Sequence, residues 1–410
     1  MQTTRRITLA LLFGALCLSA APADVKKAGM DPERLARIPA RMKTFVDQGR
    51  IAGAVTLVAR HGVIASLDAV GYQDLEKKRP MRTDSIFQIM SMTKPVTAVG
   101  IMLLMEEGRL ALSDPVEKHL PEFRGMWVIE SRDGNRARTL RRPARPITIR
   151  DLLTHTSGMS SIPPAGIRDL LSALDKTLAE AVAIYSQQPL EFEPGTKWMY
   201  SNPGIAALGR IIEVVAGQPY EKFMEERIFK PLGMKDTFFY PPADKLDRIA
   251  MVYKLERGKL LPAGPETLAG DPWQYRKGAK YPCPECGMYS TASDLAAFYQ
   301  MALNGGAYNG RRLLARPSVE VMTALHTGDL EAGHSPGMGY GLAWAVVREP
   351  LGTLQLQSIG TYGHGGAFGT QGWVDPKRDL IGVFLIGVSS GGGAEERNAF
   401  MTMTAAAITE

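Results

Sequence analysis

The sequence of 410 residues lacks the features typical of disordered, nucleic-acid-binding and membrane-spanning proteins. It contains no low-complexity tract and no long run of like charge, which argues against a disordered chain. Its lysines and arginines do not form the footprint of a nucleic-acid-binding surface, so we expect no nucleic acid as a partner. Beyond the N-terminal segment, no stretch is long and apolar enough to cross a bilayer. A globular composition over this length is typical of a large core in two lobes.

Cysteine is also scarce, with three in the chain. Cys17 falls in an N-terminal segment that we expect to be removed, which leaves Cys283 and Cys286 in the stretch PCPEC. Two cysteines do not complete a zinc site and no histidine lies nearby, so we expect no metal and no cofactor. In an oxidising compartment the pair either closes a small disulfide loop or stays as two thiols, and the sequence leaves both open.

The N-terminus has the pattern of a secretory signal. Arg5 and Arg6 precede the short apolar run Leu9 to Leu18, and Ala21-Pro22-Ala23 has small residues at both recognition positions of a cleavage site. We therefore expect residues 1–23 to be removed, which takes the formal charge from +6 to about +4. The mature protein should be exported, periplasmic or secreted, without a membrane span. The arginine pair partly resembles a twin-arginine signal, so the export route stays open.

Strands are expected at both ends of the chain and helices between them. β-Branched and apolar runs on either side of Arg60-His61-Gly62 predict a hairpin over residues 51–69. A helix is expected after Ser91, and a shorter one near residue 150 should be closed by Gly158. The other expected elements are helices over 201–217, 220–234, 293–304 and 395–408, and strands over 340–347, 371–375 and 380–389.

This order predicts an α/β (α+β) fold in which one sheet joins distant segments of the chain. The sheet lobe would comprise about residues 24–90 and 285–410, and the inserted helical lobe about residues 91–284. A cleft would form where the two lobes meet. The basic stretch from Arg132 to Arg145 has no apolar periodicity, so it is expected to be a solvated loop.

Ser91 and Lys94 form a pair with catalytic spacing in the stretch QIMSMTKPVT. Residues three apart share one helix face, and a lysine of lowered pKa can take the proton of a serine nucleophile. Pro95 is tolerated only in the first turn, which places Ser91 at the helix entry. There its N–H can also face a substrate. The alternative is that Ser91 is an ordinary helix N-cap.

Two further stretches supply candidate partners. In PGTKWMYSNPG, Tyr200 can relay a proton and Asn202 can hydrogen-bond Lys94 and a substrate carbonyl, although a buried tyrosine beside an N-cap is the plainer interpretation. In GHGGAFG, the glycines after His364 let the backbone approach a ligand closely. The N–H of Ala367, paired with that of Ser91, can form an oxyanion hole.

Together these elements resemble the serine β-lactamase and penicillin-binding-protein superfamily. The three elements are Ser91-x-x-Lys94, Tyr200-Ser201-Asn202 and His364-Gly365-Gly366, and the tyrosine points to the class C β-lactamase branch. That branch also holds DD-peptidases, D-aminopeptidases and carboxylesterases. Further stretches similar to it, among them ITIRDLLTHTSGM and STASDLAAF, extend the resemblance from about residue 30 to the C-terminus.

The resemblance implies a fold, a set of roles and a substrate class. The fold is an antiparallel sheet flanked by helices and packed on an all-helical lobe. Ser91 would be the acylated nucleophile, Lys94 and Tyr200 the base system, Asn202 a substrate contact, and the N–H groups of Ser91 and Ala367 the oxyanion site. The β-lactamases carry Lys-Thr-Gly where this chain has His364-Gly365-Gly366, so a substrate carboxylate would be held less firmly here.

These differences favour uncharged acyl esters as substrates. The alternatives are amides, turned over by a D-amino-acid peptidase or a weak β-lactamase, and a non-catalytic penicillin-binding or sensor module. The complete set of reactive residues argues against the last. Oligomeric state is not predicted. Because an unperturbed histidine titrates near neutral pH, we also expect His364 to contribute to the pH dependence of activity.

The remaining aromatic and histidine residues give weaker signals. His155 is interpreted as a packed, hydrogen-bonded side chain, and Phe368 as a contact for the acyl chain of a substrate. Trp344 and Trp373 are expected in the core. No ligand spacing is found at His61, His119, His326 and His334.

Overall fold

The computed structural model describes residues 22–134, 136–161, 175–264, 278–389 and 392–409. Residues 1–21, which hold most of the predicted signal segment, lie outside the described residues. Among the helices that are described, we find none with both the length and the apolar character needed to cross a membrane.

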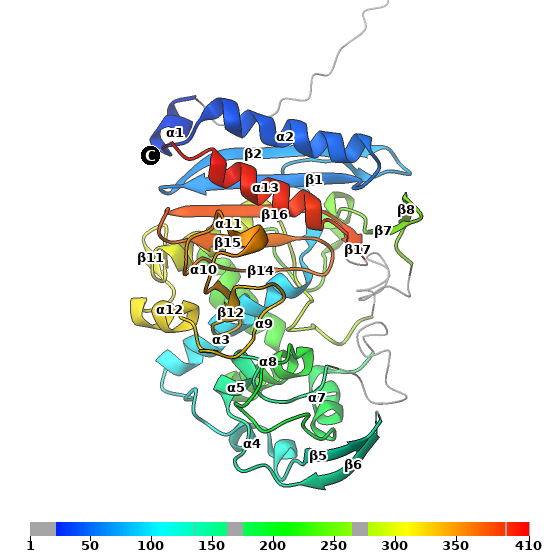
Figure 1. The fold of residues 1–410 in the computed structure, drawn as a ribbon, viewed down its shortest axis with the longest axis vertical. Coiled ribbons are helices and arrows are strands. Elements are labelled where there is room, and N and C mark those ends of the chain that lie inside the picture. Colours follow the sequence, from blue (N-terminus) through cyan, green and yellow to red (C-terminus); the bar gives the residue numbers. More distant parts are fainter. Residues whose placement is uncertain (1–21, 135, 162–174, 265–277, 390–391, 410) are drawn as a thin grey trace, which may run out of the picture.

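One eight-stranded antiparallel sheet dominates the upper lobe (Figure 1). Its order is β12-β13-β14-β15-β16-β1-β2-β3, so the N-terminal hairpin pairs with C-terminal strands. At this junction Val55 lies opposite Leu385 and Arg60 opposite Leu380. The strands are β1 (Gly53–Arg60), β2 (Val63–Asp74), β3 (Arg79–Pro80), β12 (Met338–Tyr340), β13 (Ala345–Val347), β14 (Tyr362–Gly365), β15 (Gln371–Asp375) and β16 (Leu380–Leu385). The prediction that one sheet joins distant segments is confirmed.

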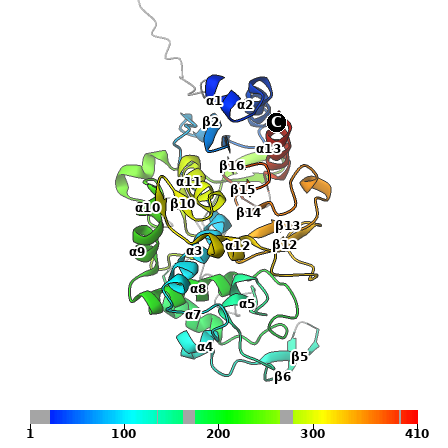
Figure 2. The ribbon, with the colours of Figure 1, turned by 90° about the vertical axis from the view of Figure 1, so that its left-hand side faces the viewer.

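Helices cover both faces of the sheet. Neighbouring residues of a strand point to opposite sides, so Val58 and Phe384 join one core and Leu57 and Val383 the other. The first core packs under α2 (Pro32–Asp47) and α13 (Ala394–Ala406), and the second under α11 (Ala292–Leu303). Figure 2 shows α11 on the opposite side of the sheet from α13.

The second lobe is built mainly of helices, and α3 (Thr93–Glu106) connects it to the sheet. Residues Thr93 to Leu104 of α3 are all buried, as expected for a helix that is apolar all round. It packs on α8 (Asn202–Ala216) and begins beside β14.

The remaining α-helices of the described residues belong to both lobes. They are α1 (Pro22–Lys27), α4 (Val116–His119), α5 (Ile149–Leu153), α7 (Leu178–Ser186), α9 (Tyr220–Met224), α10 (Lys230–Leu232) and α12 (Arg316–Thr323).

Small β elements lie outside the main sheet. They are β4 (Phe87–Gln88) with β9 (Tyr289–Ser290), β10 (Ala307–Tyr308) with β11 (Arg311–Arg312), β5 (Val128–Asp133) with β6 (Arg136–Arg141), and β7 (Tyr253–Glu256) with β8 (Lys259–Pro262) and β17 (Val388–Ser389). Because β7 pairs with β17, part of the predicted insertion 91–284 is joined to a C-terminal strand.

The basic stretch from Arg132 to Arg145 differs from the prediction. It includes most of the hairpin β5–β6, where a solvated loop was expected. Two long-range ion pairs connect the hairpin with the segment after α7, Arg132 with Glu191 and Arg141 with Glu193. The local sequence pattern reveals neither the strand pairing nor these contacts.

Two other boundaries also differ. The predicted strand 340–347 is two strands, β12 and β13, separated by a turn in which Ala343 has a φ of 61°. The predicted helix near residue 150 ends at Leu153, well before Gly158. His155 is already left-handed there, with a φ of 59°, so it and not the glycine follows the end of this helix.

Candidate active site

A cavity of about 400 Å³ brings together most of the predicted site residues. Ser91 and Tyr200 line it from the helical lobe, and His364, Gly365, Gly366 and Ala367 line it from the end of β14 and the turn after it. Lys94 lies buried behind Ser91. Elements more than 270 residues apart in sequence therefore meet at one site.

Ser91 lies on a 3-10 turn, Met90–Met92, which runs into α3. Its side chain makes no capping hydrogen bond, and Met92 holds the N-cap position of α3, so the N-cap interpretation of Ser91 is wrong. Pro95 falls in the first turn, as predicted. Met90 has a φ of 51°, a conformation that costs a non-glycine residue about 1–3 kcal/mol and that often occurs at functional sites.

Lys94 is fully buried, and its Nζ lies 2.9 Å from Ser91 Oγ. The same Nζ donates a hydrogen bond to the Glu285 carbonyl oxygen at 2.8 Å. Burial lowers the pKa of Lys94 to about 7, because the charged amine is poorly solvated. A neutral amine at hydrogen-bond distance from a serine hydroxyl can take its proton.

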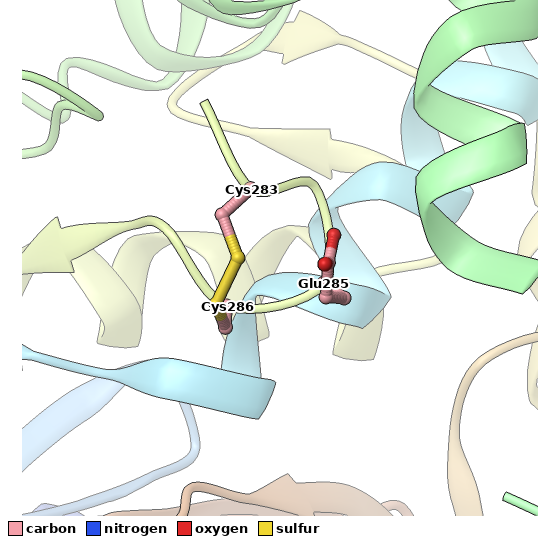
Figure 3. A group of neighbouring side chains, drawn as sticks. All are labelled: Cys283, Glu285 and Cys286. Atoms are coloured by element: carbon pink, nitrogen blue, oxygen red, sulfur yellow. A yellow bond between two sulfur atoms is a disulfide. The ribbon is translucent and has the colours of Figure 1, made fainter. Parts of the chain in front are cut away.

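A disulfide loop holds the carbonyl that Lys94 contacts. Cys283 and Cys286 are bonded to each other, which settles the choice that the sequence left open. The neighbouring Pro284 carbonyl accepts a hydrogen bond from Thr97 Oγ1 at 2.7 Å, so the loop is attached to α3 at two points. Figure 3 shows Glu285 beside the disulfide. The two sulfurs are joined to each other, so this group of side chains is not a set of metal ligands.

Replacing both Cys283 and Cys286 by alanine is expected to lower the free energy of unfolding by about 2 kcal/mol, the value for closing a loop of this length. The rate of any reaction at Ser91 should fall roughly tenfold or more, because the carbonyls that orient Lys94 and Thr97 lose their anchor. Urea unfolding and kcat measurements check the two effects. Wild-type stability and wild-type kcat in the double variant would show that the loop holds its shape without the bond.

Tyr200 sits in a cluster of aromatic rings at the base of the cavity. Its ring centroid lies 4.6 Å from that of His155 and 4.9 Å from that of His334. Burial raises the pKa of Tyr200, while a hydrogen bond with Ser91 acts in the opposite direction. Lys94 Nζ lies 4.7 Å from the centroid of the tyrosine ring. The phenol is thus hydrogen-bonded to Ser91, and the tyrosine ring lies beside the Lys94 amine.

His155 supports this cluster as predicted. It is fully buried, and its Nδ1 accepts a hydrogen bond from the Ser201 N–H at 3.2 Å. Ser201 in turn caps α8, because its Oγ accepts from the Gly204 N–H. The pKa of His155 is lowered well below its usual value, first by burial and then by the charge of Lys94. His155 is therefore a neutral packing residue beneath Tyr200.

His364 makes two hydrogen bonds, and burial keeps its ring neutral. Its Nδ1 lies 2.7 Å from the Gly365 carbonyl oxygen, which can only accept, so Nδ1 carries the proton. Its Nε2 then accepts from the Tyr340 hydroxyl, also at 2.7 Å. Burial lowers the pKa of His364 to about 3. The expectation that His364 titrates near neutral pH is therefore wrong, and the groups at the site with a pKa near 7 are Lys94 and Glu285.

Two backbone N–H groups face the cavity without partners. Within the described residues, neither the Ser91 N–H nor the Ala367 N–H donates a hydrogen bond. Gly366 makes their approach possible, because a Cβ at this position would lie 2.3 Å from the Ile89 carbonyl oxygen. A pair of free donors beside a nucleophile can hold an oxyanion.

Two predicted substrate contacts, Asn202 and Phe368, are placed differently. Asn202 does not line the cavity or bond Lys94, and its buried Oδ1 has no hydrogen-bond partner within the described residues. Phe368 is buried in the core and does not line the cavity, so it does not provide the expected acyl contact. Trp344 and Trp373 are core residues as predicted, and Trp373 also reaches the cavity wall.

Other residues at the site gave no local signal in the sequence. His334 packs against Tyr200, Tyr340 fixes His364, and Glu285 lies in the loop that binds Lys94. Arg397 lines the cavity from α13. Among the described residues its guanidinium has no ion-pair or hydrogen-bond partner, and burial lowers its pKa. Each of these side chains reaches the site through tertiary packing, and none of them belongs to a recognisable sequence motif.

The chain is similar to several known proteins. A family model named Beta-lactamase matches residues 38–406. An uncharacterised protein of Mycobacterium tuberculosis is 34% identical over 367 residues, which are 85% of this chain and 88% of that protein. Esterase EstB of Burkholderia gladioli is 32% identical over 384 residues, 87% of this chain and 92% of EstB. The solved structure of EstCE1, a hydrolase with promiscuous acyltransferase activity, matches with a TM-score of 0.79 at 28% identity, covering 92% of this chain and 99% of EstCE1.

Proposed function

The chain belongs to the β-lactamase family and is a serine hydrolase, and we propose that it is an esterase that cleaves small uncharged acyl esters through an acyl-enzyme on Ser91. In the first step neutral Lys94 takes the proton of Ser91, and Oγ forms a bond to the ester carbonyl carbon. The carbonyl oxygen becomes an oxyanion that accepts hydrogen bonds from the N–H groups of Ser91 and Ala367.

Collapse of this intermediate breaks the bond to the alcohol. Tyr200 passes the proton from Lys94 to the leaving alkoxide, which departs as the alcohol and leaves the acyl group on Ser91. Water then attacks the acyl-enzyme, and its proton follows the reverse route to Ser91 as the acid is released. The 2.9 Å separation of Nζ and Oγ supports the assignment of Lys94 as the base.

The observation that carries the ester proposal is the neutral state of the His364 side chain. Burial lowers the pKa of His364 to about 3, which leaves no charge on this side chain, and Gly365 offers no hydroxyl. The wider cavity is lined in part by apolar side chains, among them Met338, Leu354 and Met401, which fit an uncharged acyl group. Similarity to EstB supports the same class of reaction.

Arg397 favours a second candidate, a peptidase or weak β-lactamase whose substrates carry a carboxylate. Its unpaired guanidinium lies in the same cavity, near Gly365. A cation of this kind can bind a carboxylate with two parallel hydrogen bonds. A non-catalytic penicillin-binding or sensor module is disfavoured, because the relatives include esterases.

A substrate panel separates the two candidates. We expect kcat/KM for p-nitrophenyl acetate and butyrate to exceed that for a chromogenic cephalosporin or a D-alanyl peptide by roughly 100-fold or more, about 3 kcal/mol of transition-state preference. A preference for the cephalosporin or the peptide would contradict the ester assignment.

The matched test of the second candidate is Arg397→Met against Arg41→Met, a surface arginine that pairs with Glu395. A loss confined to anionic substrates in the Arg397 variant would favour the peptidase or lactamase.

A further inference from the structure

Glu285 is a buried ionisable side chain that the proposed mechanism does not use. It is fully buried, and its backbone carbonyl oxygen accepts the 2.8 Å hydrogen bond from Lys94. Its Oε1 accepts from the Tyr281 hydroxyl at 2.8 Å, while Oε2 is buried without a hydrogen-bond partner in the described part of the chain. Burying a carboxyl with an unsatisfied oxygen is costly, so packing alone does not account for this residue.

We propose that Glu285 is a positioning residue for the base, and that its carboxylate supplies the negative charge that stabilises Lys94 after Lys94 takes the proton of Ser91. This inference rests on the proposed function. Above pH 7, where Glu285 is ionised, the proton moves from Ser91 Oγ to Lys94 Nζ, and Glu285 neither gains nor loses one. The charge on Lys94 changes from zero to +1 in surroundings that contain little water, where a fixed anion has its largest effect.

The carboxylate acts through space. Among the described contacts, Lys94 bonds the backbone carbonyl of Glu285 and forms no direct ion pair with its carboxylate. Its charge nevertheless raises the pKa of Lys94, opposing the larger effect of burial. In the same way, burial raises the pKa of Glu285 to about 7, although the charge of Lys94 acts in the opposite direction, so Glu285 is an anion above that pH. The disulfide loop fixes the separation, because the same residue supplies the carbonyl and the carboxyl.

The other titratable groups around this pair are neutral at pH 7. Burial lowers the pKa of each of the three histidines on which the charge of Lys94 acts, His155, His334 and His364. Burial likewise raises the pKa of the tyrosines that the charge of Glu285 affects, Tyr185, Tyr200 and Tyr220. Tyr281 donates to the carboxylate. Among these described neighbours none supplies a competing charge, so Glu285 is the anion that Lys94 senses.

Glu285→Gln tests the proposal because glutamine keeps the shape and the acceptor for Tyr281 but removes the charge. Without that charge the pKa of Lys94 falls, so the neutral amine persists to lower pH. The acid limb of kcat/KM for p-nitrophenyl acetate should therefore move to lower pH. The plateau kcat should fall roughly tenfold, because the protonated lysine loses its counter-charge, with KM nearly unchanged.

Glu285→Asp is the matched variant, since it keeps the charge on a shorter side chain. We expect its acid limb to stay close to that of the wild type. An acid limb in Glu285→Gln that overlays the wild type would overturn the proposal, since a purely structural role predicts that result. If Glu285→Gln does not fold, a Glu285→Asp acid limb displaced to lower pH would overturn it instead.

The proposed function has its own readout. Mass spectrometry of an acylated Ser91 peptide reports the acyl-enzyme in each Glu285 variant, whatever the pH profile does. Acylation of Ser91 together with an unmoved acid limb would overturn the role of Glu285 and leave the esterase proposal intact. Failure to acylate Ser91 in the wild type would count against the function itself.

Discussion

Replacing Ser91 by alanine is expected to reduce ester turnover by roughly 10⁶-fold, the loss seen when a serine hydrolase loses its nucleophile. Alanine removes the oxygen that would form the acyl bond and the atom that lies 2.9 Å from Lys94 Nζ. The backbone N–H groups of Ser91 and Ala367 remain, so a small residual rate over water should survive. Steady-state rates on p-nitrophenyl acetate measure the loss.

Ser186→Ala is the matched control for this substitution. Ser186 is buried in α7, where its Oγ donates to the Ala183 carbonyl and accepts from Gln187 Nε2, and it does not line the cavity. Its variant should keep wild-type turnover. Comparable activity in Ser91→Ala and Ser186→Ala would place the hydrolytic site elsewhere, and stoichiometric acylation of wild-type Ser91 without turnover would favour a penicillin-binding module.

The fold was predictable where local signals agree with one another. The turn at Arg60-His61-Gly62 lies between two β-branched runs. Strand β1 ends at Arg60, and β2 begins directly after Gly62. Pro95 placed the start of α3 correctly. Hydrophobic alternation alone could not show that 340–347 is two strands, because the reversal depends on Ala343, whose N–H donates to the Leu153 carbonyl in the other lobe.

The site was predictable to the extent that short motifs carry it. Ser91, Tyr200 and His364 are marked by their spacing and neighbours, and they meet at one cavity. The charge state of His364 was not predictable, because it depends on burial in the folded protein, where Tyr340 of another strand contacts its Nε2. Glu285 and Arg397 reach the site through a disulfide loop and a helix that have no catalytic pattern of their own.

Lys94 should control both the rate and its pH dependence. Its pKa is lowered from 10.5 to about 7, so it is protonated below that pH and neutral above it. Only the neutral amine can accept the serine proton, so kcat/KM should rise with pH through about 7 and then level off. His364, with a pKa of about 3, does not contribute to this rise.

Lys94→Gln and Lys94→Arg together show whether Lys94 acts as a proton acceptor or only as a positive charge. Glutamine cannot take a proton, and arginine stays charged at every accessible pH, so each should lower kcat by about 10²–10⁴-fold, the usual contribution of general-base catalysis. Rates between pH 5 and 9, with thermal unfolding as a check on folding, measure both variants. Since arginine keeps a positive charge beside Ser91, substantial activity in Lys94→Arg would mean that Lys94 acts by its charge. Equal loss in both variants, with the rise near pH 7 gone, is the result that a neutral amine requires.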